Sequence, residues 1–81
     1  MSIHKTYAVL GLGRYGHAVA TQLVKSGAEV LAVDQNESIV NAAALELPLC
    51  KCADVTDPDA LRMLGISNVD VVIFAMANRL E

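Results

Sequence analysis

Three glycines at fixed spacing are the residues of this 81-residue chain that point most directly to chemistry. The segment Gly11-Leu12-Gly13-Arg14-Tyr15-Gly16 has the pattern Gly-x-Gly-x-x-Gly. In such a segment Gly11 permits a tight turn, Gly13 has no Cβ to keep a pyrophosphate from the backbone, and Gly16 lets a helix pack closely on a sheet. N–H groups at the start of that helix, together with its dipole, favour an anion. The pattern therefore predicts a phosphate-binding loop.

A carboxylate stands where a ribose would be expected. Asp34 ends the next apolar run after the glycines, and such a side chain can accept hydrogen bonds from both ribose hydroxyls while repelling a 2′-phosphate. Gln35 follows it rather than an arginine, so NADP is disfavoured and both residues are assigned to the site. The alternative for Asp34 is an N-cap of the next helix, which Asn36 can supply instead.

Arg14 lies inside the glycine segment, where a guanidinium can make charge-assisted contacts to a second or third phosphate. The alternative is a solvated loop arginine. Tyr15, its neighbour in the loop, is included among the nucleotide-facing residues. His17 follows Gly16 and is interpreted as an ordinary helix residue, and no catalytic residue is identified.

The far side of the predicted site is less specific. Asp54 comes just after the third apolar run, where it could accept from the exocyclic amine of adenine or simply start the turn toward Asp57. Ala75 ends the fourth apolar run and Met76 follows it, close to the crevice in which open α/β sheets bind ligands, although a role in filling a gap in packing is the first interpretation for Met76.

The elements that position these residues follow from four short apolar runs, at residues 7–10, 30–33, 47–50 and 71–75. Three of them lack polar alternation, as strands buried on both faces do, and the third, with Pro48, is expected at the sheet margin. Segments with helical period separate the runs, with Gly27 past the first helix, Asn36 capping the second, and Asp57-Pro58 starting the third. The order predicts an α/β fold, a Rossmann-like doubly wound parallel sheet with strand order 3-2-1-4.

Composition narrows the function classes. Six basic residues are scattered among nine acidic ones, for a net charge of −3, which makes nucleic acid an unlikely partner. No apolar stretch approaches the roughly 18–20 residues that cross a bilayer, so the chain is expected in the cytosol. Cys50 and Cys52 lack further well-placed ligands, so reduced cysteines and no metal site are expected.

A complete dinucleotide fold of this kind has six strands, and this chain ends shortly after the fourth. Residues 1–81 are therefore expected to be the N-terminal part of a single Rossmann-type nucleotide-binding domain, truncated after the fourth strand. The edge of the run at residues 71–75 would be unprotected and apolar, which predicts self-association into a homodimer at least.

Several segments together resemble the N-terminal domain of the RCK/KTN proteins (TrkA-N type), the cytosolic regulators of potassium channels and transporters. The resemblance rests on these segments: Ala8-Val9-Leu10-Gly11-Leu12-Gly13-Arg14-Tyr15-Gly16, Val33-Asp34-Gln35-Asn36-Glu37, Ala53-Asp54-Val55-Thr56-Asp57, Leu64-Gly65-Ile66 and Asp70-Val71-Val72-Ile73.

This resemblance implies a regulatory, non-catalytic domain that binds NAD, NADH, ADP or ATP. It also implies a ring of such domains at the inner face of the cell membrane, bound to a membrane-embedded transporter or channel subunit. It places Asp54 and Val55 on the adenine side. Two alternatives stay open: the cofactor half of an NAD-dependent dehydrogenase, and a scaffold that assembles without binding a nucleotide.

Overall fold

A four-stranded parallel sheet forms the centre of the molecule, and the computed structural model describes residues 5–75 of the chain. Its strands are β1 (Thr6–Leu10), β2 (Glu29–Asp34), β3 (Cys50–Cys52) and β4 (Val71–Phe74), in the order β3-β2-β1-β4. Every pairing in the sheet is parallel. The predicted Rossmann-like fold and its 3-2-1-4 order are confirmed.

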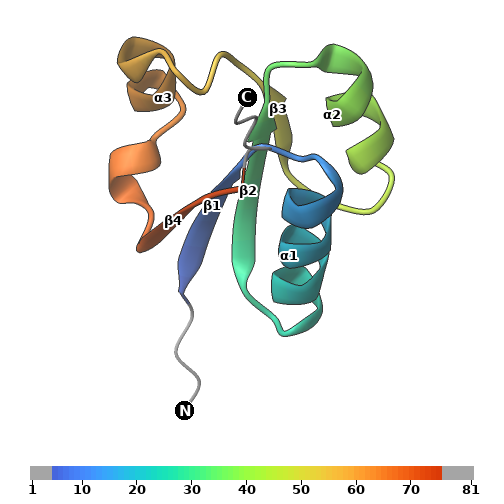
Figure 1. Ribbon diagram of the computed structural model, residues 1–81. Coiled ribbons are helices and arrows are strands. Elements are labelled where there is room, and N and C mark those ends of the chain that lie inside the picture. The colour runs from blue at the N-terminus through green and yellow to red at the C-terminus, as the bar shows by residue number, and fades with distance from the viewer. Residues whose placement is uncertain (1–4, 76–81) are drawn as a thin grey trace.

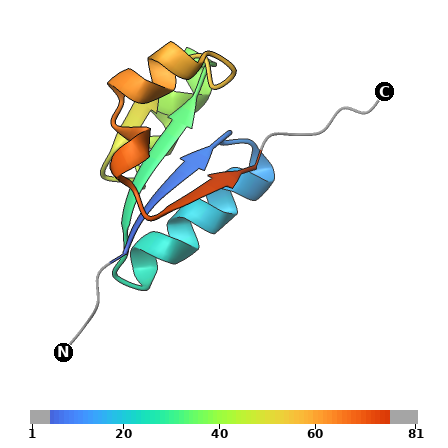
Figure 2. The ribbon, with the colours of Figure 1, turned by 90° about the vertical axis from the view of Figure 1, so that its left-hand side faces the viewer.

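Helices cover both faces of the sheet. The helices α1 (Arg14–Lys25) and α2 (Glu37–Ala43) lie on one face, and α3 (Pro58–Met63) with the 3₁₀ turn η1 (Ile66–Asn68) lies on the other (Figures 1 and 2). This arrangement follows because crossover connections between parallel strands are right-handed. The two crossovers that run from β1 to β3 place their helices on one face, and the return to β4 on the far side of β1 places α3 on the other.

Alternate residues of each inner strand enter two separate cores, which explains why the strands lack polar alternation. Val9 packs toward α1 and α2, whereas Ala8 and Leu10 pack toward α3, and all three are fully buried. The buried residues of the first core are Val9, Leu12, Ala20, Val30, Ala32, Ala43, Leu47 and Ala75. Those of the second are Ala8, Leu10, Leu31, Val33 and Val55.

The helix ends carry the predicted signals. Gly27, with φ 95°, follows α1 and donates its N–H to the Val24 carbonyl, while the N–H of Ala28 reaches the Leu23 carbonyl. These two bonds form a Schellman motif. The Asn36 side chain caps α2, and Asp57 caps α3 ahead of Pro58.

The third strand differs from its prediction. The apolar run at residues 47–50 mostly precedes β3, which spans Cys50–Cys52 and lies at the sheet margin as expected. Leu47 is buried in the core beneath α2, while Leu49 is about half exposed and contributes only its carbonyl, which accepts the N–H of Ala32. Pro48 has no N–H for a ladder, so pairing becomes regular only after it.

The opposite margin of the described sheet is β4. Val72 and Phe74 pair with Ala8 and Leu10, so their side chains lie on the α3 face, where they are 37% and 64% exposed.

Among residues 5–75 no helix has the length and apolar character needed to cross a membrane. The same residues contain no group of three or more side chains suited to holding a metal ion.

Candidate nucleotide-binding site

The glycine segment forms the turn between the carboxyl end of β1 and the start of α1, next to the end of β2. Gly11 has φ 103°, a left-handed conformation that glycine adopts without strain, and its N–H donates to the Val33 carbonyl at 2.7 Å. The turn is thereby fixed to β2. This places the start of α1 beside Asp34, at the edge of the sheet where parallel α/β folds bind ligands.

Gly16 is where α1 approaches the loop most closely. A Cβ at this position would lie 1.8 Å from the Gly11 carbonyl oxygen and 3.1 Å from the Cβ of Ala75. Only glycine fits between the loop and the end of β4. The predicted role of Gly16 in close packing is thus seen in the contacts, and the neighbouring Ala75 is buried.

Gly13 lies in a different environment. It precedes α1 with φ −68° and ψ −164°, and a Cβ added there would meet no atom of the described residues within 4 Å. Neither backbone conformation nor packing against residues 5–75 requires glycine here. The lack of a side chain instead leaves the backbone accessible, as an approaching phosphate needs.

Within the described part of the chain, residues 5–75, no side chain caps the start of α1, and the first turn of this helix has no acidic residue. The first intrahelical bond joins the His17 N–H to the Gly13 carbonyl, so the N–H groups of the preceding helical residues lie ahead of it. In contrast, Asn36 caps α2 and Asp57 caps α3. The helix that follows the glycines is therefore the one whose N-terminal donors remain suited to an anion.

The Asp34 carboxylate is held between two backbone donors. Its Oδ2 accepts the N–H of Leu12 at 2.7 Å, and its Oδ1 accepts the N–H of Asn36 at 2.8 Å. An ionised carboxylate has about four acceptor positions, so two remain for hydroxyl donors. Asp34 is not the cap of α2, which is Asn36, but it does join the glycine loop to the end of β2.

Three predicted site residues present exposed side chains around this edge: Arg14, Tyr15 and Gln35. Tyr15 is 67% exposed. Arg14 and Gly13 line a pocket of about 310 Å³ between the start of α1 and the helix α2. The guanidinium is thus placed next to the helix start, where it can reach an anion.

The predicted adenine side has a mixed outcome. The Asp54 Oδ1 accepts the hydroxyl of Thr56 at 2.6 Å and its N–H at 2.9 Å, and these bonds, the hydroxyl first, lower the pKa of the exposed carboxyl. Asp54 therefore does start the turn, and it stays ionised. The Val55 side chain is buried in the core beneath α3, which leaves its backbone for any contact with a ligand. Met76 lies outside the described residues.

Two residues that sequence reasoning set aside lie at this site. His17 lines the same pocket as Gly13 and Arg14. Cys52 pairs with Asp34 in the sheet register and is exposed, with its Sγ 3.6 Å from the Gln35 carbonyl oxygen. One sequence signal could have indicated the position of His17: it follows Arg14 by three residues, so the two side chains are neighbours on the helix surface.

Comparison with known proteins decides the family. The model of the TrkA-N domain matches residues 7–81, which is most of the chain. The chain belongs to the TrkA-N domain family. The resemblance on the glycine, Asp34 and Asp54 segments is thereby confirmed.

The chain is similar to potassium uptake proteins and, over a shorter stretch, to a dehydrogenase. Ktr system potassium uptake protein A of Bacillus subtilis (strain 168) is 41% identical over 78 residues, which cover 96% of this chain and 35% of that protein. Ktr system potassium uptake protein C of the same organism is 38% identical over 77 residues, 95% of this chain and 35% of that protein. Phenylalanine dehydrogenase of Lysinibacillus sphaericus is 47% identical over 38 residues, 47% of this chain and 10% of that enzyme.

The coverage figures also set the scale of the chain. It spans about a third of the length of the potassium uptake proteins that it matches. The similarity to the dehydrogenase extends over less than half of the chain, whereas the similarity to the potassium uptake proteins extends over nearly all of it.

Proposed function

We propose that this chain is the nucleotide-binding part of a regulatory protein for a potassium channel or transporter, and that it binds NAD(H) or ADP/ATP without catalysing a reaction. The observation that carries the proposal is the uncapped start of α1, with open space at Gly13 and the anchored Asp34 carboxylate beside it. The potassium uptake systems named for its relatives supply the biological setting.

The proposed ligand lies with its phosphates at the start of α1 and its adenosine ribose at Asp34. The two acceptor positions left on that carboxylate suit the two ribose hydroxyls. A 2′-phosphate would meet this negative charge with the neutral Gln35 beside it, so NADP is disfavoured. On the adenine side, we assign Asp54 as an acceptor for the exocyclic amine and Val55 as a backbone contact, with Ala75 and Met76 near the crevice.

The first test is a calorimetric titration of the chain with AMP, ADP, ATP and NADH, before and after Arg14→Ala. A charged hydrogen-bonded pair is worth about 1.5–3 kcal/mol, reduced by the exposure of Arg14. We therefore expect the variant to weaken ADP and ATP by about 1 kcal/mol more than AMP, or roughly fivefold in Kd. The matched control is Lys25→Ala. Lys25 is an exposed basic residue in the last turn of the same helix, and its replacement should leave all four affinities unchanged.

The outcomes separate the proposals. Equal losses for all nucleotides would indicate a site built from backbone donors alone and remove the sequence argument for a nucleotide sensor. The cofactor half of a dehydrogenase is the alternative, and the partial similarity to phenylalanine dehydrogenase is the observation that favours it. Tight NADH binding with no measurable ADP or ATP binding would support that alternative. A failure of every adenine nucleotide to bind would leave a scaffold.

The proposal extends to assembly. We propose that residues 1–81 are the N-terminal part of one Rossmann-type domain, that the chain forms at least a homodimer, and that it acts at the cytoplasmic face of the membrane through a transporter partner. The unpaired margin of β4 in the described sheet, with Val72 and Phe74 exposed, supports self-association. Light scattering should show a dimer or larger species, and a monomer at about 100 μM would contradict it.

A further inference from the structure

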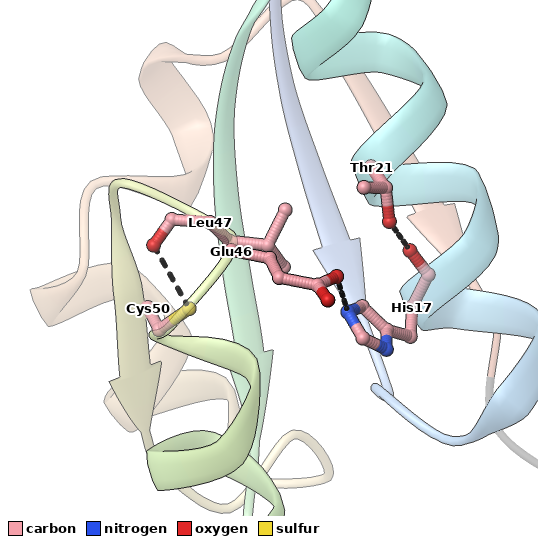
Figure 3. Close-up of polar contacts among 5 residues, drawn as sticks. All are labelled: His17, Thr21, Glu46, Leu47 and Cys50. Atoms are coloured by element: carbon pink, nitrogen blue, oxygen red, sulfur yellow. Dashed lines mark hydrogen bonds and ion pairs between the residues drawn. The ribbon is translucent and has the colours of Figure 1, made fainter.

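His17 connects the first turn of α1 to the segment that follows α2. Its Nε2 atom lies 2.9 Å from the Glu46 Oε1 atom, and Figure 3 shows the two side chains facing each other across the space between these segments. The His17 side chain is 36% exposed and that of Glu46 is 58% exposed. The backbone of His17 is fixed separately, because the Thr21 hydroxyl donates to its carbonyl one turn later in α1.

The contact leaves the imidazole nitrogen incompletely satisfied. Nε2 is buried, yet no atom within residues 5–75 is aligned to form a hydrogen bond with it. The carboxylate is close enough to attract an N–H at this position but lies off the donor direction. A buried polar atom without an aligned partner costs free energy, so a better-placed acceptor would be favoured.

An anion bound at the start of α1 would supply such an acceptor. His17 and Arg14 are three residues apart on this helix, and both line the pocket of about 310 Å³ that Gly13 opens onto. Side chains on a helix tilt toward its N-terminus, which directs both toward the first turn, whose N–H groups no side chain of residues 5–75 caps. An anion bound there lies within reach of the guanidinium and of the imidazole.

We propose that His17 is a phosphate-positioning residue of the nucleotide site, and that Glu46 competes with the phosphate for its imidazole. The inference rests on the proposed function, because it requires a phosphate at the start of α1. Glu46 is more than half exposed and can turn into water when a phosphate replaces it. Nucleotide binding then breaks a contact between α1 and the segment at residues 44–49. This segment leads into β3 at the margin of the sheet.

The test is a double-variant cycle on the 81-residue chain, with ADP and adenosine as the probes and calorimetry as the measurement. We expect His17→Ala to weaken ADP binding about three- to tenfold, the range for one charge-assisted hydrogen bond at a partly exposed site, and Glu46→Gln to tighten ADP binding by a similar factor. Combining the two should abolish the gain from Glu46→Gln. Adenosine, which has no phosphate, should bind all variants equally.

The controls separate positioning from general electrostatics and from loss of fold. Glu37→Gln removes an exposed carboxylate from the first turn of α2 and should change ADP affinity by less than about twofold. His17→Gln keeps a side-chain N–H donor and should recover part of the loss. Circular dichroism confirms that each variant is folded. If Glu46→Gln tightens ADP equally with and without His17, the effect is long-range charge and the inference is wrong.

A spectroscopic readout follows the imidazole itself. In the His4→Gln variant His17 is the sole histidine of the chain, so its ring resonances are assigned without ambiguity. Saturation with ADP, and separately Glu46→Gln, should each move the His17 ring signals, whereas adenosine should not. Unchanged signals at saturating ADP would overturn the inference and leave the proposed function intact. A wild-type chain that binds no adenine nucleotide would overturn both.

Discussion

Gly16→Ala is the substitution for which local and tertiary reasoning predict opposite signs. On helix propensity alone, alanine in the first turn of α1 should stabilise the chain by about 0.5–1 kcal/mol. In the folded chain the new Cβ would lie 1.8 Å from the carbonyl oxygen of Gly11 and 2.9 Å from its carbon. Both atoms belong to backbone, so the helix must move away from the loop by roughly 1–2 Å to reach an ordinary contact distance.

The magnitude follows from what that movement disrupts. Overpacking a well-packed site costs about 1–3 kcal/mol, and a backbone neighbour places this site at the upper end. After the gain in helix propensity, we expect a net loss of about 2 kcal/mol in the free energy of unfolding. A domain of this length has roughly 4–12 kcal/mol in total. The melting temperature should therefore fall by roughly 8–16 °C.

Gly13→Ala is the matched control in the same loop. Its Cβ would meet no described atom within 4 Å, and φ −68° suits any residue. Stability should change by less than about 1 kcal/mol, because alanine restricts the unfolded chain but is less favourable than glycine at the N-cap position that Gly13 occupies. ADP affinity should nevertheless fall roughly tenfold, since the new methyl group lies where the phosphate approaches.

Urea denaturation followed by circular dichroism, and calorimetry with ADP, measure the two effects. A Gly16→Ala variant as stable as the wild type would refute the argument from close approach. A Gly13→Ala variant with unchanged ADP affinity would refute the placement of the phosphates.

Three further predictions test other contacts. Asp34→Ala should weaken ADP binding by about 1.5–3 kcal/mol and also lower the free energy of unfolding by about 2 kcal/mol in urea, because two backbone N–H groups lose their acceptor. A maleimide should label the exposed Cys52 faster than Cys50, because burial raises the pKa of the Cys50 thiol. ADP should slow the labelling of Cys52 alone, and mass spectrometry measures both rates. The pKa of Asp70 is lowered below 3.8 by the backbone and then the side-chain hydrogen bond from Thr6, so its stabilisation is lost as pH falls through that lower value. Asp70→Asn should then flatten the decline of stability below about pH 4 in urea titrations.

Local signals predicted most of the elements correctly. The glycine segment, the caps at Asn36 and Asp57 and the glycine after α1 all lie where sequence reasoning placed them, because each depends on the conformation of a few neighbouring residues. The third strand begins later in the chain than its apolar run at residues 47–50 predicts. It is a short strand at the sheet margin, so pairing with β2 decides which residues belong to it.

The roles of single side chains were harder to predict. Asp34 was predicted as a ribose acceptor, and the structure adds that its carboxylate joins two backbone segments that meet only in the folded chain. Val55 was assigned to the adenine side, and its side chain lies in the core beneath α3. His17 was interpreted as an ordinary helix residue, because its partner Glu46 lies in a segment that no periodicity connects to α1.

The sequence by itself therefore determined the order of elements, the parallel sheet and the glycine turn between β1 and α1, since these follow from hydrophobic periodicity, glycine conformation and right-handed connections. The tertiary structure alone decided why Gly16 must be glycine, which donors orient Asp34 and which carboxylate meets His17. Each of these depends on distances between segments far apart in the chain, and such distances are set only when the helices pack on the sheet.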